Sequence, residues 1–222
     1  MHTYASNVNN HSLFSGLHSA SFFGIVEIVA SLIAVEGCDI NQTDLKGNTP
    51  LMLAALGGSE EVVKTLLGRD DVNPDQSNNA GRTSLSCAAF NGHEGVVKVL
   101  LGRNDVNPNQ PDSDGQTPLC WAASRGREAA VKTLLERDDV NSNKPDRNGK
   151  TPLCWAALNG NEGVVKILLG RDDVNPNQPD SDGETSFSLA ACNGHEGVVK
   201  ILLGRDDVNP NQPDSYGKTP LC

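Results

Sequence analysis

The sequence of 222 residues is poor in aromatic side chains, with two Trp, two Tyr and five Phe. Glycine and proline are abundant by comparison, at 22 and 12 residues. Aromatic side chains dominate the packing of large cores. This composition therefore favours short elements joined by many turns over one large globular core.

Long apolar runs and an early basic segment are missing as well. The apolar stretch 22–35 is too short to span a bilayer and carries Glu27. No Lys or Arg precedes Lys46, whereas a secretory signal begins with positive charge. We therefore expect no membrane partner and an intracellular, cytoplasmic location, with the nucleus left open.

The motifs of several chemistries are absent or incomplete. Gly149-Lys150-Thr151 resembles the end of a P-loop, but Lys144 stands where that loop needs its first glycine. Asp180 and Asp182 resemble part of a calcium loop whose closing glutamate is replaced by Leu189. No CxxC pair occurs, and the formal net charge of -10 counts against nucleic acid. We expect no catalytic residue, cofactor or metal, and hence no enzyme.

What the sequence does contain is a strict internal period. The glycine that stands two residues before a Thr recurs every 34 residues, at Gly47, Gly81, Gly115, Gly149, Gly183 and Gly217. Paired leucines such as Leu134-Leu135 keep the same spacing. A unit of this size cannot bury its apolar face alone, so a fixed period predicts a stack of similar units.

The local signals within a unit predict two helices and a finger. In the unit that begins at Gly115, Thr117 suits a helix N-cap and Pro118 suits the first helical position. Gly126 ends that helix, and residues 128–135 carry a second apolar face at helical spacing. A polar, proline-rich stretch follows, which excludes helix and predicts an extended finger.

These signals divide the chain into a tail and a repeat domain. We expect residues 1–12 to be a mobile tail and residues 13–222 to form the repeat domain. Within that domain, 13–46 is a degenerate first unit whose helices we place at Leu17–Phe23 and Ile25–Glu36. Five full units of 34 residues occupy 47–216, and residues 217–222 form a stub.

The stretches TPLCWAASRG, GHEGVVKVLLG and DVNPNQPDSDG together resemble ankyrin repeats. The resemblance covers residues 13–222 and implies an all-α solenoid of stacked helix-turn-helix units with β-hairpin-like fingers. The family unit has 33 residues, and its TPLH histidine is replaced here by Cys120, Cys154 and Cys222. That replacement leaves the hydrogen bonding at the start of the inner helix open. The near-identical units resemble fungal tandem ankyrin arrays, some of which follow an NTPase module.

Ankyrin repeats bind partners in a concave groove, so the resemblance implies a protein-interaction scaffold or adaptor. The resemblance also implies that the positions that vary from unit to unit lie at the finger tips and on the inner helix. As partner-binding candidates we name Arg82, Phe90, Asn91, Ser113, Asp114, Gln116, Ser124, Arg125, Arg147, Asn148, Lys150, Leu158, Asn159, Asp182 and Glu184. Drift of unconstrained surface positions is the alternative explanation of this variation.

Aromatic and arginine side chains concentrate interface energy, which favours Phe90, Arg125, Arg147 and Tyr216 as anchors. For Trp121 and Trp155 we favour packing between repeats over partner binding. Two other interpretations compete with the adaptor: a regulatory or sensor segment of a larger NTPase-type protein, present here as a fragment, and a duplicate without function. The stub at 217–222, which starts another unit without completing it, motivates both.

Overall fold

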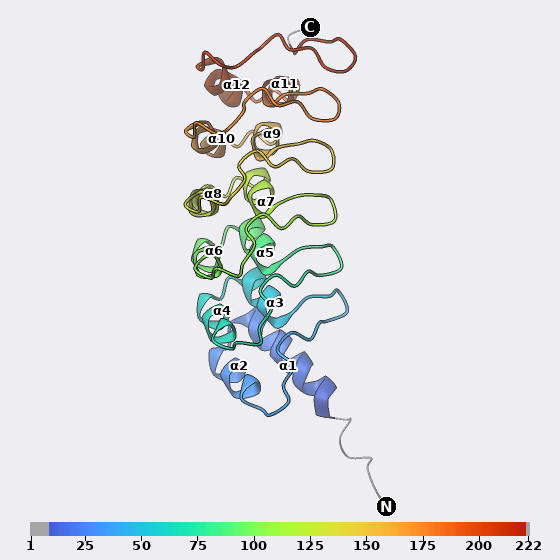
Figure 1. Cartoon of the computed structure of the whole chain (residues 1–222), viewed down its shortest axis with the longest axis vertical. Coiled ribbons are helices and arrows are strands. Elements are labelled where there is room, and N and C mark those ends of the chain that lie inside the picture. The colour runs from blue at the N-terminus through green and yellow to red at the C-terminus, as the bar shows by residue number, and fades with distance from the viewer. Residues whose placement is uncertain (1–8, 221–222) are drawn as a thin grey trace, which may run out of the picture. The chain divides into compact units, whose positions relative to one another are not determined.

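The computed structural model describes the backbone of residues 9–220 and the side chains of residues 16–220. Within residues 9–220 it has twelve helices and no strand, and Figure 1 labels each of them. Their bounds are α1 Asn9–Phe23, α2 Val26–Ile33, α3 Pro50–Gly57, α4 Glu60–Leu67, α5 Ser84–Asn91, α6 Glu94–Leu101, α7 Pro118–Ser124, α8 Glu128–Leu135, α9 Pro152–Leu158, α10 Glu162–Leu169, α11 Ser186–Cys192 and α12 Glu196–Leu203. None of these helices has the length and hydropathy needed to cross a bilayer.

The chain divides into two compact units. The first combines residues 1–88 with 95–107, and the second combines residues 89–94 with 108–222. Helix α5 is shared between them, since Ala88 belongs to the first unit and Ala89 to the second. The division therefore cuts across the 34-residue period.

In the first unit, inner and outer helices stack separately: α1 packs on α3, and α2 packs on α4. Leu17, Val29, Met52 and Leu66 are almost fully buried between them. The unit also holds His18, whose Nε2 lies 3.2 Å from the carbonyl oxygen of Asn48. The degenerate first repeat thus contributes a genuine helix pair to this core.

The predicted bounds of that helix pair were wrong in detail. Helix α1 begins at Asn9, before the predicted start at Leu17, and α2 ends at Ile33, before the predicted end at Glu36. Of the tail predicted at residues 1–12, residues 1–8 lie outside the described residues, while 9–12 are helical. A helix that is anchored further along gains one hydrogen bond for each residue added, so it extends beyond its apolar segment.

The second unit repeats the same stacking with greater regularity. Inner helix α9 packs on both α7 and α11, and outer helix α10 packs on both α8 and α12. Leu119, Leu134, Leu153 and Leu168 are at most 1% exposed in this core. The first leucine of each pair therefore marks the buried side of the outer helices, while the second leucine ranges from buried at Leu169 to exposed at Leu203.

Inner helices α3, α7, α9 and α11 each start at a threonine cap. Thr151 Oγ1 accepts the backbone N–H of Cys154 at 3.2 Å, and Pro152 occupies the first helical turn. Thr117 and Cys120 repeat this geometry at 3.2 Å. The Thr151 hydroxyl in turn donates to Cys154 Sγ at 3.3 Å. The cysteine that replaces the family histidine thus keeps a hydrogen bond to the cap.

The predicted β-hairpin-like fingers are projecting loops (Figure 1), each closed by a tight turn and without a regular strand among residues 9–220. In the fourth finger the Asp146 N–H donates to the Lys150 carbonyl at 3.0 Å, and the Gly149 N–H donates back to Asp146 at 3.0 Å. Gly149 has φ 78, and a Cβ there would lie 2.7 Å from the Ser181 amide nitrogen. Prolines in the finger lack the N–H groups that a ladder of strands needs.

Asparagine side chains replace the missing ladder between successive fingers of the second unit. The side-chain oxygens of Asn109, Asn143 and Asn177 accept the backbone N–H of the residue 32 positions later, at 2.8, 2.9 and 2.7 Å. One backbone hydrogen bond also joins neighbouring finger tips, for example from Ser181 N–H to the Asn148 carbonyl at 2.9 Å. The longer finger of this chain is therefore held at both its base and its tip.

Candidate partner-binding groove

A buried aspartate organises three of the fingers in the second unit. Asp112, Asp146 and Asp180 occur at the 34-residue period and are each 7% exposed. In the finger before α9, Asp146 Oδ1 accepts the backbone N–H of Asn148 and of Lys150, both at 2.9 Å. One carboxylate oxygen thereby fixes the finger tip and leaves the second oxygen for another partner.

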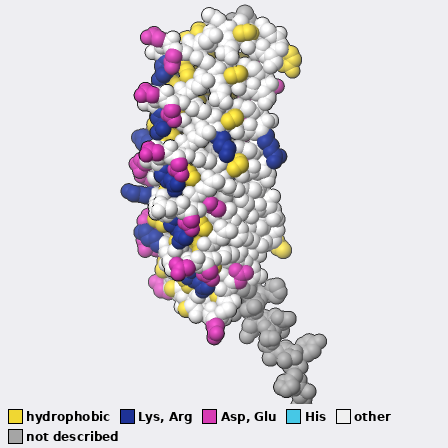
Figure 2. Space-filling view, viewed as in Figure 1, with side chains coloured by type: hydrophobic (Ala, Val, Ile, Leu, Met, Phe, Trp, Pro, Cys, Tyr) yellow, Lys and Arg dark blue, Asp and Glu magenta, His cyan; other side chains and the backbone are white. Residues whose placement is uncertain are grey.

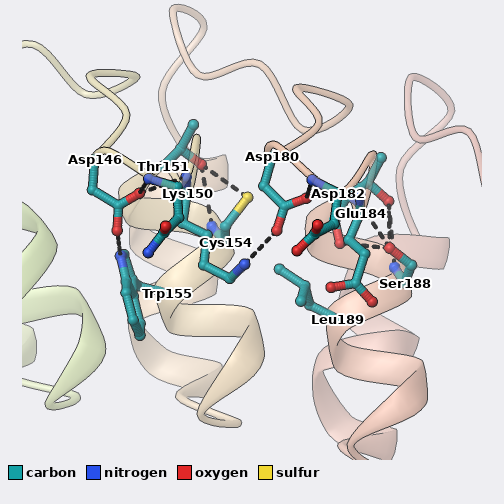
Figure 3. Close-up of polar contacts among 12 residues, drawn as sticks. Asp146, Lys150, Thr151, Cys154, Trp155, Asp180, Asp182, Glu184, Ser188 and Leu189 are labelled. Atoms are coloured by element: carbon teal, nitrogen blue, oxygen red, sulfur yellow. Dashed lines mark hydrogen bonds and ion pairs between the residues drawn. The ribbon is translucent and has the colours of Figure 1, made fainter. Parts of the chain in front are cut away.

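In two consecutive repeats that second oxygen fixes a tryptophan. The Trp121 Nε1–H donates to Asp112 Oδ2 at 3.0 Å, and the Trp155 Nε1–H donates to Asp146 Oδ2 at 3.0 Å. Figure 3 shows the latter pair, with the indole of Trp155 lying against its own helix. Both indoles remain half-buried. They present a fixed aromatic surface, because turning either indole would break the hydrogen bond of its Nε1–H.

In the next repeat the equivalent aspartate, Asp180, has a different partner. Leu189 stands in the tryptophan position and is 3% exposed, and Asp180 Oδ2 pairs with the Lys150 ammonium group (Figure 3). Burial alone would lower the pKa of Lys150, but the hydrogen bond and charge of Asp180 raise it above its usual value. The charge of Lys150 therefore stabilises the array through its pairing with Asp180 and is not available to a partner.

An aromatic and arginine cluster lies beside Trp121. The rings of Phe90 and Trp121 meet edge to face, with centroids 5.2 Å apart. The guanidinium carbon of Arg125 lies 4.3 Å from the centroid of the Phe90 ring, within the range of a cation–π contact. Arg127 adds a hydrogen bond of 3.3 Å from its Nε to the Phe90 carbonyl. The cluster orients Arg125 and leaves it exposed.

Between the two indoles the surface is hollowed. A pocket of about 250 Å³ is lined by Gln116, Trp121, Ser124, Arg125, Trp155 and Asn159. Its walls come from α7 and α9, with Arg125 and Asn159 at the C-terminal ends of those helices and Gln116 from the finger before α7. The pocket combines two aromatic faces with one cation and several neutral polar groups.

Comparison with known proteins identifies the architecture. A family model described as ankyrin repeats in three copies matches residues 17–112 and 96–180, and a model of a single ankyrin repeat matches residues 182–215. The chain belongs to the ankyrin-repeat family. The crystal structure of the human ASB11 ankyrin repeat domain is similar, with a TM-score of 0.81 and 25% identity over 92% of this chain and 89% of that chain. A search of curated proteins found no match. The predicted all-α ankyrin fold is thus confirmed.

Four of the predicted partner-binding residues line this pocket of the ankyrin array: Gln116, Ser124, Arg125 and Asn159. Phe90 contacts the pocket wall through Trp121. Exposed side chains at the finger tips of the second unit are Ser113, Asp114, Arg147, Asn148 and Asp182. The structure therefore gathers most of the variable positions of this unit on its fingers and inner helices.

The remaining candidates have positions that suit a partner less well. Arg82 is half-buried and belongs to the first unit. Asn91 and Leu158 are half-buried, and the Leu158 carbonyl lies 2.9 Å from His195 Nε2. Tyr216 is 81% exposed at the tip of the last finger. These four residues do not line the pocket between α7 and α9.

Three carboxylates gather at the finger before α11. The carboxylates of Asp180, Asp182 and Glu184 offer oxygens within 4.8 Å of one another. Burial, and then the charge of Asp180, raises the pKa of Glu184. Both oxygens of Asp180 already serve the scaffold, through Lys150 and two backbone N–H groups. The cluster therefore follows from the construction of the finger and gives no reason to assign a metal.

Trp121 and Trp155, for which the sequence favoured packing between repeats, both line the pocket. The sequence analysis did not identify the hydrogen bonds that hold their indoles. Each stands nine residues after the finger-base aspartate that accepts its Nε1–H. That pairing of Asp and Trp occurs in two consecutive repeats and is broken in the next, where Leu189 replaces the indole. The recurring spacing was the available signal, because it gives each buried indole N–H a specific acceptor.

Proposed function

We propose that this chain is a non-catalytic interaction scaffold that holds another protein against the inner helices and fingers of its second unit. Ankyrin repeats are generally protein-interaction modules. The pocket between Trp121 and Trp155 carries the proposal, because there a repeated framework presents residues that differ between repeats. The proposal includes an intracellular setting, and no nucleic acid partner is expected at a net charge of -10.

The framework around the pocket supports binding more than chemistry. Cys120, on inner helix α7, is fully buried, and burial raises its pKa to about 11. A thiol in that state is a poor nucleophile. Cys154, in the equivalent position of the next repeat, also has its pKa raised by burial. Both thiols pack the inner helices and do not face the groove as reactive groups.

Affinity capture from the source cell lysate, read by mass spectrometry, tests the proposal. The groove variant carries Arg125→Ser, Arg147→Ser and Asn159→Ala, all at exposed positions. The control variant carries Lys132→Ser and Lys166→Ser, which are exposed on outer helices α8 and α10. A partner retained by the native chain and the control, but lost by the groove variant, is the expected result. Equal capture by all three proteins would overturn the groove as the binding surface.

The same experiment separates the adaptor from its alternative. An array that regulates a larger NTPase-type protein would bind a domain of that protein when the domain is supplied as a separate chain. An adaptor would instead capture a protein encoded elsewhere. The identity of the groove-dependent partner therefore distinguishes the two functions.

A further inference from the structure

Two arginines on the groove side of the second unit, Arg125 and Arg147, differ from the arginines on the loops after the outer helices. On the loops after the outer helices, Arg137, Arg171 and Arg205 each pair with the aspartate two residues later, at 2.6, 2.8 and 2.7 Å. Arg125 and Arg147 have no carboxylate within 4 Å among the described residues. Both side chains are exposed.

This pattern runs against the charge of the whole protein. The sequence carries 28 acidic and 18 basic residues, and Arg125 and Arg147 add exposed positive charge to this acidic protein. Figure 2 shows one column of alternating basic and acidic side chains and, apart from it, a few Lys or Arg side chains without acidic neighbours. Exposed cations without internal partners are suited to an anionic group on a partner.

The pocket next to Arg125 adds an apolar requirement. Its volume of about 250 Å³ lies below the range typical of small-molecule sites and suits a single side chain. The indoles of Trp121 and Trp155 are already fixed by Asp112 and Asp146. An incoming side chain would therefore meet pre-organised aromatic walls, at little cost in conformational entropy.

The acidic finger before α11 restricts where negative charge can sit. Asp182 is exposed and Glu184 half-buried, and both would repel a carboxylate that extended past α9. A partner's acidic groups are thus favoured at α7 and at the finger before α9, where Arg125 and Arg147 lie. Asp114, exposed at the tip of the finger before α7, adds negative charge on the other side of Arg147. Repulsion by these acidic side chains and attraction by Arg125 and Arg147 together set the register of a bound segment.

We propose that the groove of the second unit binds an extended acidic peptide segment, with one apolar or aromatic side chain between Trp121 and Trp155 and carboxylates on Arg125 and Arg147. This inference rests on the proposed function and specifies the chemistry of the partner. The peptide's carboxylate extends the stack in which Arg125 already lies on Phe90, since a guanidinium can bind an aromatic face and an anion together.

Selection of a displayed random peptide library on the full chain tests the chemistry directly. The native chain is expected to enrich peptides that combine Asp or Glu with one large apolar residue. The variant Arg125→Glu with Arg147→Glu is expected to enrich Lys and Arg instead. The control variant, Lys132→Glu with Lys166→Glu, makes the same change in charge on the outer helices and is expected to keep the acidic enrichment. Matching thermal melts of the three proteins show that each is folded.

Intrinsic fluorescence places the bound peptide. Trp121 and Trp155 are the only tryptophans of the protein, so a peptide in the pocket changes the emission of both. The highest-ranked selected peptide, synthesised without Trp and with blocked ends, is titrated into each protein. We expect binding about 10–100-fold weaker for the Arg125→Glu, Arg147→Glu variant, and similar weakening when the peptide's apolar residue becomes Ala.

Three results would overturn the inference: no enrichment of acidic residues by the native chain, enrichment unchanged in the Arg-to-Glu variant, or saturable binding without a change in tryptophan emission. A groove-dependent partner captured from lysate whose binding segment is neutral or basic would leave the proposed function standing and remove this inference alone. Loss of groove dependence in both experiments would remove both.

Discussion

Two neighbouring repeats of the second unit, residues 149–182 and 183–216, share an outer framework and differ on the groove side. The stretch EGVVKILLGRDDVNPNQPDS is identical at Glu162–Ser181 and Glu196–Ser215. Inner helix α9 carries Trp155, held by Asp146, whereas α11 carries Leu189 and leaves Asp180 to Lys150. The outer helices and loops thus keep the same sequence in both repeats. The equivalent aspartates, Asp146 and Asp180, have different hydrogen-bond partners.

The caps of the two inner helices show the same division. Helix α9 uses Thr151 with Pro152, while α11 uses a reciprocal capping box between Thr185 and Ser188. Ser186, in the proline position, donates its hydroxyl to the Pro176 carbonyl at 2.9 Å. Different residues satisfy the same exposed backbone groups, because any acceptor that reaches the first-turn N–H groups stabilises the helix start.

The largest expected effect falls on the shared framework. Leu134→Ala removes a fully buried side chain and should lower the free energy of unfolding by about 2–5 kcal/mol. Leu203→Ala, at the exposed member of the leucine pair in the last repeat, is the matched control and should change it little, since Leu203 is 53% exposed. Urea denaturation measures both. Equal losses would mean that the framework does not carry the stability.

A smaller loss is expected at the finger base. Asp146→Ala removes the acceptor of two backbone N–H groups and of the Trp155 indole, which should cost about 3 kcal/mol. Asp214→Ala removes the same two backbone contacts from the half-buried last finger and involves no tryptophan. Only the first variant should also shift tryptophan emission. An unshifted spectrum would contradict the role of Asp146 in fixing Trp155.

The ion pair between Lys150 and Asp180 can be tested separately. Lys150→Met leaves Asp180 Oδ2 buried without its cation and should cost about 1–3 kcal/mol at neutral pH. Asp180→Asn in the same background should recover part of the loss, since Asn78 fills the equivalent position in an earlier repeat. A double-mutant cycle measures the coupling free energy between Lys150 and Asp180. If the effects of the two single substitutions were additive, the pair would contribute nothing to stability.

The protonation state of Lys150 gives that pair a pH dependence. The folded pKa of Lys150 is raised, so the contribution is fully present below its unfolded value of about 10.4. It is lost as the pH rises through the folded pKa. The difference in stability between the native chain and Lys150→Met should therefore shrink as the pH rises through that alkaline range.

The smallest expected effect concerns the loops after the outer helices. Hydrogen bonds from Arg171, and then from Ser142, hold the pKa of Asp173 below its usual range. Because the folded pKa is lowered, the charged carboxylate stabilises the fold above about pH 3.9. This stabilisation is lost as the pH falls through the folded pKa. Because Asp173 is 49% exposed, Asp173→Asn should cost only a few tenths of a kcal/mol. An NMR titration of this carboxyl at or above its usual pKa would contradict the pairing.

Much of the fold was predictable from short stretches of sequence. Thr151, Pro152 and the glycine after each inner helix fix helix starts and ends through contacts within four residues. The period of the leucine pairs predicted which face of each outer helix is buried. The sequence did not indicate that Asn and Asp side chains hold the fingers. The prediction failed in the first repeat, where Phe22 and Phe23 stay 45% and 73% exposed.

The sequence by itself determined the period, the helices, the ankyrin architecture and the positions that vary. Only the tertiary structure decided which variable residues form a pocket and which are committed to the scaffold. Arg125 and Lys150 look equivalent as candidate cations, yet one lies exposed on Phe90 and the other is bound to Asp180. The reason is physical: helix signals act over a few residues, whereas the partner of Lys150 stands 30 residues away and meets it only when the repeats stack.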